Sequence, residues 1–184
     1  FWLKPFGLKL PAIILDVPLI KLTTPAMATD PQCSYDLLFA ELAARFRTDG
    51  WEARQEEPAG AYLHVSRPGW GDERMNGIHL EAYVLKPQLQ AGSAPVALHC
   101  EHGCPFQRQF MERFIERAGA EIQRWETPWL GNYALGPAEG SSVCEVQVPL
   151  AANASDTVER LAAELQRLQT LEPLIEQVIK ECSQ

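Results

Sequence analysis

The segment GIHLEAYVL (residues 77–85) alternates strictly between apolar side chains and polar or aromatic ones. The apolar set is Ile78, Leu80, Ala82 and Val84, and the other set is His79, Glu81 and Tyr83. Because successive side chains of an extended chain point to opposite faces, the pattern predicts a β-strand with one apolar face. Such a strand belongs in a sheet that other elements cover on one face only.

Two neighbouring segments show the same alternation. AYLHVS (61–66) precedes this strand and VALHCE (96–101) follows it, and each carries a histidine, His64 or His99, out of phase with its apolar residues. The connections RPGWGDERMNG (67–77) and KPQLQAGSAP (86–95) contain Gly and Pro and predict loops. Since short connections favour neighbouring antiparallel strands, we expect these segments to pair antiparallel.

Three segments with apolar residues at helical spacing accompany the strands. The first covers about 35–48, with Ser34 as its N-cap and Gly50 beyond its end. The second begins at Pro105 and is expected to stop at Gly119. The third opens at Ser155 and restarts or kinks at Pro173.

The remaining segments predict further short strands. Residues 51–55 predict one, residues 122–136 predict one or two, and SSVCEVQVPL (141–150) places Cys144 and Val146 in the apolar phase, as Cys100 is in VALHCE. The sequence thus predicts an α+β fold: a two-layer domain with a mainly antiparallel sheet and helices on one face. The expected order is helix, three strands, helix, one or more strands, helix.

The composition changes near residue 30. The first 26 residues contain four prolines, and Asp16 interrupts their apolar part, which is shorter than the roughly 20 residues of a membrane span. We expect residues 1–30 to be a non-core arm, upstream of a natural start at Met27 or disordered, and residues 34–182 to form a single α+β domain. A signal peptide is the alternative, because Lys4 and Lys9 precede the apolar part.

The charge and cysteine content limit the classes of partner. The 184 residues carry a formal net charge of −8, whereas a surface for nucleic acid or an anionic membrane needs clustered Lys and Arg. Both partners are therefore disfavoured. Five cysteines without regular spacing argue against a disulfide framework and favour a reducing compartment, the cytoplasm.

The segment HCEHGC (99–104) concentrates histidine and cysteine. A structural zinc site usually needs four ligands in two pairs, and this single cluster lacks a CxxC and a second pair. Cys104 is the candidate reactive thiol, because it precedes a predicted helix whose dipole and free N–H groups favour a thiolate. A capping or half-buried cysteine is the alternative.

A second candidate site follows from the strand phases. His64, His79, Glu81, His99 and Glu101 all fall on the face opposite to the apolar residues. If a metal binds there, His79, Glu81 and His99 are the expected ligands. The favoured interpretation is that a half-buried sheet displays polar residues to water, so no cofactor is expected.

The order of elements resembles two families over most of residues 34–182. It is similar to the small acidic chaperones of type III secretion systems, and to the core of restriction-endonuclease-like domains. The second resemblance implies magnesium bound by Asp72 and Glu81, but the position where that pattern expects Lys holds Tyr83. Lys86 lies outside the pattern.

The function predicted by these observations is non-catalytic binding of a protein or peptide, as in an adaptor or chaperone. Trp70, Trp129 and Tyr133 lie in loops with polar neighbours and are the candidate partner-binding residues. The apolar face of the last helix offers a way to form a homodimer. The alternative function is that of a metal-dependent hydrolase or a degenerate restriction-endonuclease-like nuclease.

Overall fold

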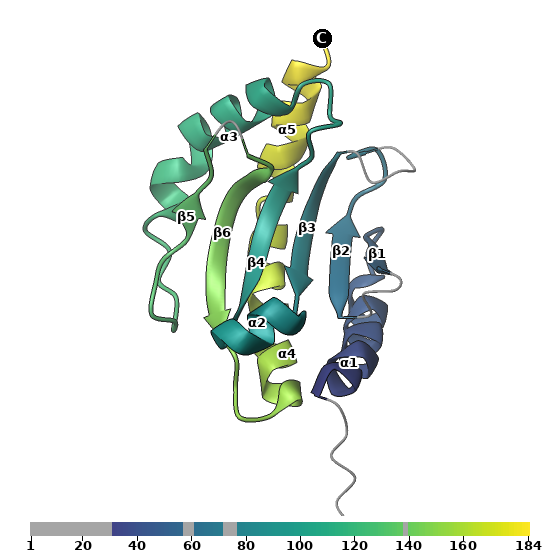
Figure 1. Cartoon of the computed structure of the whole chain (residues 1–184). Helices are drawn as coiled ribbons and strands as arrows, with labels where there is room; N and C mark the ends of the chain where they lie inside the picture. The colour runs from purple at the N-terminus through teal and green to yellow at the C-terminus, as the bar shows by residue number, and fades with distance from the viewer. Residues whose placement is uncertain (1–30, 57–60, 72–76, 138–139) are drawn as a thin grey trace, which may run out of the picture.

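A computed structural model describes residues 31–56, 61–71, 77–137 and 140–184. In these ranges the chain forms one antiparallel sheet with the order β1-β2-β3-β4-β6-β5, together with five helices (Figure 1). The strands are β1 (Glu52–Gln55), β2 (Tyr62–Ser66), β3 (Ile78–Tyr83), β4 (Ser93–Cys100), β5 (Ala134–Leu135) and β6 (Ser142–Pro149). The helices are α1 (Pro31–Phe46), α2 (Lys86–Ala91), α3 (Gln107–Ile122), α4 (Ala154–Gln169) and α5 (Glu172–Cys182). The predicted α+β class and order are confirmed.

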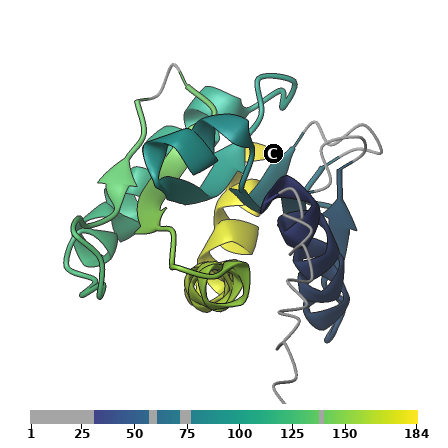
Figure 2. The same cartoon turned by 60° about the horizontal axis from the view of Figure 1, so that its bottom comes forward.

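Helices α1 and α4 cover one face of the sheet, as the two views in Figures 1 and 2 show. Between this helical layer and the sheet lies the apolar core, to which β2, β3 and β4 contribute Leu63, Leu80 and Leu98, all fully buried. Burying each of these leucine side chains stabilises the folded state by about 1.5–3 kcal/mol. Cys100 and Cys144 are also fully buried, in the phase that the strand alternation predicts.

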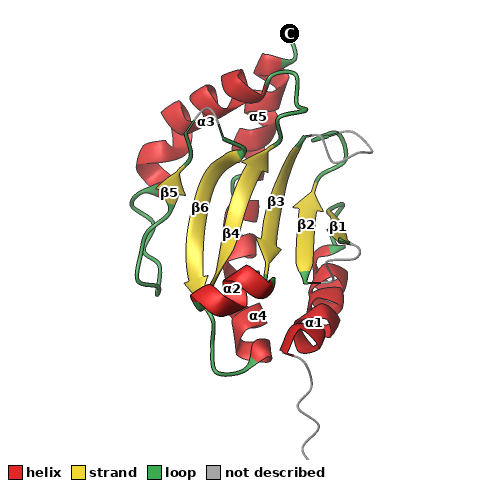
Figure 3. Ribbon diagram, viewed as in Figure 1, coloured by secondary structure: helices red, strands yellow, loops and turns green. Residues whose placement is uncertain are grey.

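The opposite face of the sheet carries no helix over its middle among the described residues (Figure 3). At the lower end of this view lies α2, and at the upper end α3 packs with α5. We call this side the open face. The alternate residues of β2, β3 and β4 that are out of phase with the core point to it.

Several elements differ from the sequence prediction. Helix α1 begins at Pro31, so Ser34, the expected N-cap, lies within the helix. Residues 86–91 form the short helix α2 instead of a loop, with Pro87 in its first turn and Gly92 ending it at φ 72°. The left-handed conformation at Gly92 strongly favours glycine. Helix α3 also continues past Gly119 to Ile122, because the buried face of the helix continues there. A Cβ at Gly119 would lie 3.0 Å from Leu135 Cδ1, so glycine lets β5 approach closely.

The start of α4 is set by Asn153 instead of Ser155. Asn153 Oδ1 accepts a hydrogen bond of 2.7 Å from the backbone N–H of Asp156, which caps the helix. Pro173 lies in the first turn of α5, in agreement with the prediction that the helix restarts or kinks at this residue. The kink between α4 and α5 therefore follows from a proline placed where its missing N–H costs little.

The predicted arm, residues 1–30, lies outside the described residues, and its role stays a prediction. Among the described helices there is none with the length and hydropathy needed to cross a bilayer.

Candidate functional site

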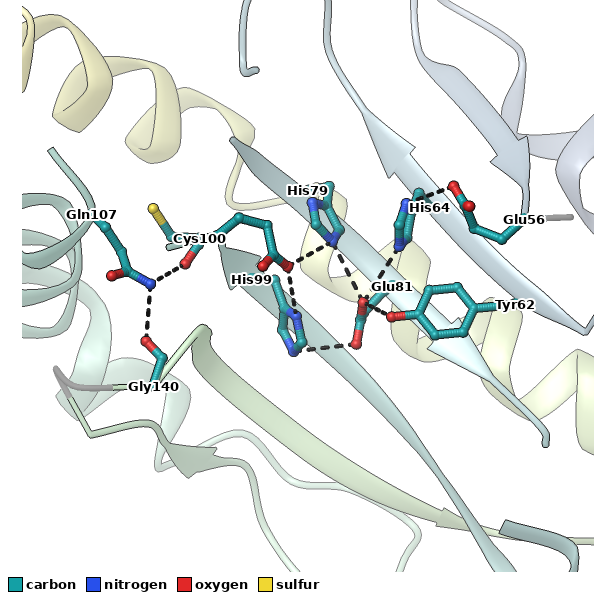
Figure 4. A network of polar contacts seen from close by, with 10 residues as sticks. Glu56, Tyr62, His64, His79, Glu81, His99, Cys100, Gln107 and Gly140 are labelled. Carbon is teal, nitrogen blue, oxygen red and sulfur yellow. Dashed lines mark hydrogen bonds and ion pairs between the residues drawn. The ribbon is translucent and has the colours of Figure 1, made fainter. Parts of the chain in front are cut away.

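The pairing of β2, β3 and β4 brings three histidines around one glutamate on the open face (Figure 4). His79 and Glu81 share this face because they are two residues apart on β3. In the register of the sheet, His64 of β2 lies opposite Glu81, and His99 of β4 lies opposite His79. We call His64, His79, Glu81 and His99 the histidine–glutamate cluster.

All three imidazoles turn their Nε2 atoms toward the carboxylate of Glu81. The distance from His99 Nε2 to Glu81 Oε1 is 3.2 Å. The other oxygen of Glu81, Oε2, lies 3.4 Å from His79 Nε2 and 3.6 Å from His64 Nε2. Tyr62 also donates a hydrogen bond of 2.6 Å from its hydroxyl to Oε2. One carboxylate therefore lies at the centre of four polar side chains from three strands.

Two further carboxylates contact the outer sides of the imidazoles. Glu56 Oε1 lies 3.4 Å from His64 Nδ1, and Glu101 Oε1 lies 3.5 Å from His99 Nδ1. The same oxygen of Glu101 is 3.7 Å from His79 Nε2. Glu101 is held at this place by its backbone N–H, which donates to the carbonyl of Gly77. The cluster is thus enclosed by an outer pair of carboxylates.

The centre of the cluster is buried although none of the described helices covers it. Glu81 is 2% exposed and His79 is 3% exposed, because the side chains of neighbouring strands close over them. Burial acts to raise the pKa of Glu81, but the contacts with His64 and His79 outweigh burial and hold the pKa well below its ordinary value. Glu81 is therefore a carboxylate at neutral pH.

The pKa values of two neighbours of Glu81, His79 and Tyr62, shift so that the neutral form of each is favoured. Burial lowers the pKa of His79, and the nearby imidazoles lower it further, against the raising effect of Glu81. Burial and then the charge of Glu81 raise the pKa of Tyr62. At neutral pH His79 is thus a neutral imidazole and Tyr62 a hydroxyl donor.

The cluster and the neighbouring Glu101 contain two sets of three residues whose ligand atoms lie within 4.8 Å of one another, close enough to hold a metal ion. One set is His64, His79 and Glu81, and the other is His79, His99 and Glu101. The metal ligands expected from the sequence, His79, Glu81 and His99, are brought into contact, but they are divided between the two sets and do not form one of them. The structure adds that His79 and Glu81 are buried and that His99 is only partly exposed to water.

A hollow of about 250 Å³ opens beside His79 on the side of β1. Its described lining includes Glu52, Arg54 and Ser66, which are in phase with the open face. Arg54 and Glu52 form a loose ion pair at 3.9 Å. The hollow gives the edge of the cluster room for a small group or a side chain of a partner.

The aromatic residues predicted to bind a partner lie in the packed part of the fold. Trp70 is buried and packs edge-on against Trp51, with ring centroids 5.3 Å apart. Trp129 Nε1 and the hydroxyl of Tyr133 each donate a hydrogen bond of 2.9 Å to the buried Glu164. These contacts give all three residues a structural role, and their partner-binding role stays a prediction.

The two other candidates have different outcomes. Cys104 is buried, and its backbone N–H donates to the carbonyl of Glu101 in the turn before α3. Its reactivity as a thiol stays a prediction. Asp72, the first acid of the nuclease pattern, lies outside the described residues. Tyr83, where that pattern expects Lys, stacks on Tyr62 with ring centroids 4.8 Å apart.

Sequence reasoning did not single out Tyr62, Glu56 or Glu164. Tyr62 was detectable, because it is in phase with His64 on β2. Glu56 follows β1 and contacts His64 only through the pairing of β1 with β2, and Glu164 lies on the apolar face of α4. No signal in the sequence indicates that Glu56 contacts His64 or that Glu164 accepts hydrogen bonds from Trp129 and Tyr133.

Comparison of the chain with protein-family models, curated proteins and solved structures gives no match of significance to any of them.

Proposed function

We propose that the chain is a non-catalytic binding domain that holds a basic segment of a protein or peptide on the open face of its sheet. The observation that supports this most is the absence of a helix over the middle of this face among the described residues (Figure 1). A sheet with one uncovered face presents rows of side chains from several strands at once. Such a surface suits an extended or helical partner.

Charge selects the kind of partner. The charged residues in phase with the open face are Glu52, Arg54, Glu56, Glu81, Glu101 and Glu145. Carboxylates outnumber the cation, in keeping with the net charge of −8. Lys and Arg side chains of a partner complement this surface, whereas phosphates are repelled. The proposal therefore favours a basic peptide over nucleic acid.

The stacked rings of Tyr62 and Tyr83 add an aromatic contact surface. Their planes are 3° apart and both side chains are half-buried, so one side of the pair remains accessible. Aromatic faces attract the guanidinium and ammonium groups of a basic segment. The pair lies next to Glu81, which places apolar contact and negative charge within one small area.

A peptide-binding measurement tests this function. Labelled peptides of mixed sequence, one pool rich in Lys and Arg and one rich in Asp and Glu, are titrated with the protein and followed by fluorescence anisotropy. We expect the basic pool to bind, with an affinity that falls as salt rises, and the acidic pool not to bind. Glu145→Lys is expected to weaken binding about tenfold, since a rim charge is reversed.

The matched control is Glu116→Lys, an equal charge reversal on the exposed side of α3. It is expected to leave peptide binding unchanged. Equal binding of both pools, or equal loss in both variants, would rule out recognition by the open face.

A further inference from the structure

We infer that the histidine–glutamate cluster binds one divalent ion of a first-row transition metal, with zinc or iron(II) as the best-suited ions. This inference does not rest on the proposed peptide binding, although both use the open face. It reverses the expectation from sequence that no cofactor is present, because four observations on the cluster agree with a metal site.

The first observation is the spacing of the ligand atoms. Two ligands of a tetrahedral ion with bonds of about 2.0–2.1 Å lie about 3.3–3.4 Å apart. In the set His64, His79 and Glu81, the separations from Oε2 of Glu81 are 3.4 Å to Nε2 of His79 and 3.6 Å to Nε2 of His64. Ordinary N–H···O hydrogen bonds are shorter, at about 2.9–3.0 Å. The side chains are therefore spaced more like ligands of a common ion than like hydrogen-bonded partners.

The second observation is the presence of unpartnered nitrogen atoms. The Nε2 atoms of His79 and His64 are buried and have no hydrogen-bond partner in the described part of the chain, and Nδ1 of His64 has only its 3.4 Å contact with Glu56. A buried polar atom without a partner is destabilising, so native proteins rarely keep one without a reason. His79 is 3% exposed, and its Nε2 points at the carboxylate of Glu81 (Figure 4). An ion between these groups would satisfy both nitrogens directed at Glu81.

The third observation concerns charge. Glu81 is a buried carboxylate, and the ion pairs of the described residues give it no Arg or Lys partner, only histidines. A divalent ion held by His64 and His79, whose rings are 4.2 Å apart, would supply the positive partner that this buried carboxylate lacks.

The fourth observation is the outer pair of carboxylates. Metal-bound histidines commonly donate their second N–H to a carboxylate, which fixes the tautomer and the orientation of the ring. Glu56 stands at Nδ1 of His64 and Glu101 at Nδ1 of His99, at 3.4 and 3.5 Å. With Nδ1 protonated toward these carboxylates, the lone pair of each Nε2 is directed at the centre of the cluster.

The same geometry limits the stoichiometry and the kind of ion. His79 belongs to both sets of ligands, and its single Nε2 can bind only one ion at a time. The site therefore takes one ion per chain. Imidazole ligands suit zinc, iron, nickel and copper, whereas magnesium and calcium prefer sites made of oxygen atoms alone. Either set, with two imidazoles and one carboxylate, selects against the latter two.

Metal titration of the full-length protein, stripped with a chelator and carrying no histidine tag, tests the inference. Isothermal titration calorimetry with Zn²⁺, and Co²⁺ followed by its d–d absorption, are expected to give one site per chain. Mg²⁺ and Ca²⁺ are expected to give none. His64→Gln or His99→Gln, whichever removes a ligand of the occupied set, should weaken Zn²⁺ binding at least tenfold, and unchanged binding in both would contradict the inference. Glu56→Gln should weaken it by about 10–100-fold where His64 is a ligand, as loss of an outer carboxylate typically does.

The fourth histidine, His102, provides the matched control, because it is exposed and takes no part in the cluster. His102→Gln is expected to bind Zn²⁺ as the unchanged protein does. Circular dichroism and urea unfolding confirm that each variant is folded, and the partly exposed His64 and His99 are chosen for that reason. Absence of a Zn²⁺ or Co²⁺ site, more than one site per chain, or an equal loss in His102→Gln would overturn the inference.

The two proposals fail separately. Zn²⁺ binding is measured without peptide, and peptide binding is measured with the stripped and the loaded protein. A metal site without peptide binding would refute only the proposed function. Peptide binding without a metal site would refute only this inference.

Discussion

At the scale of single residues, the buried Glu164 shows how one acceptor can hold a loop. Trp129 and Tyr133 both donate to its carboxylate, and Arg167 lies 3.4 Å from it within α4. The loop between α3 and β5 is thus tied to the helical layer by a charged acceptor with two neutral donors. Hydrogen bonds to a charged group are stronger than those between neutral groups.

Replacing Glu164 by Leu is expected to lower the free energy of unfolding by about 2–5 kcal/mol. The change leaves the hydroxyl of Tyr133 and Nε1 of Trp129 without an acceptor, at about 1–3 kcal/mol for each unsatisfied group. Glu164→Gln keeps one acceptor oxygen, so its free energy of unfolding should fall by less. Urea unfolding of both variants, followed by tryptophan fluorescence, measures the difference. An equal loss in both would show that the two hydrogen bonds are not the cause.

Cys144 provides a second prediction at this scale. Burial, opposed by a hydrogen bond at Leu98, raises the pKa of its thiol to about 12, so the thiolate is scarce at neutral pH. Burial likewise raises the pKa of Cys100. We expect a thiol reagent to label both cysteines in urea and neither in the native protein, as read by peptide mass spectrometry. Fast labelling of either one under native conditions would contradict its place in the core.

At the scale of elements, the ends of helices α3 and α4 are set by different means. The start of α4 is fixed locally, by the N-cap that Asn153 provides. The end of α3 is fixed by packing, because its buried face continues through Gly119 against Leu135. A local cap can be read from the sequence, whereas an end set by tertiary contacts cannot.

Asn153→Ala is expected to lower the free energy of unfolding by about 1 kcal/mol, because the backbone N–H of Asp156 loses its acceptor. Asn153→Ser keeps a capping oxygen, so its free energy of unfolding should be close to that of the unchanged protein. Chemical denaturation of the two variants measures this. If the serine variant loses as much as the alanine variant, the side-chain cap is not what stabilises the start of α4.

At the scale of the whole molecule, the central strands should be the most stable part. Strands β3 and β4 each pair on both sides and lie over α4, whereas β1 and β5 pair on one side only. We expect native-state hydrogen exchange to be slowest for the amides of β3 and β4 and fastest in the short β5. Faster exchange in β3 than in β1 would contradict the sheet order.

Much of the fold could be predicted from the sequence, because the alternation at residues 77–85 is a local property. The short helix α2 could not, since six residues are too few for a periodic pattern and Leu85 provides no side-chain cap. The site was predictable in part. Strand phase assigns His79, Glu81 and His99 to one face, but the register and the resulting burial depend on how the strands align.

The register of β3 has a further consequence for folding. A slip of one residue along a neighbouring strand would turn His79 and Glu81 toward the leucines of the core and bring Leu80 to the open face. A carboxylate among leucines, with none of its histidines in reach, is strongly destabilising. Misaligned pairings are therefore penalised by the same residues that form the cluster. In this way a polar cluster selects one strand alignment out of several that the apolar pattern alone would leave close in energy.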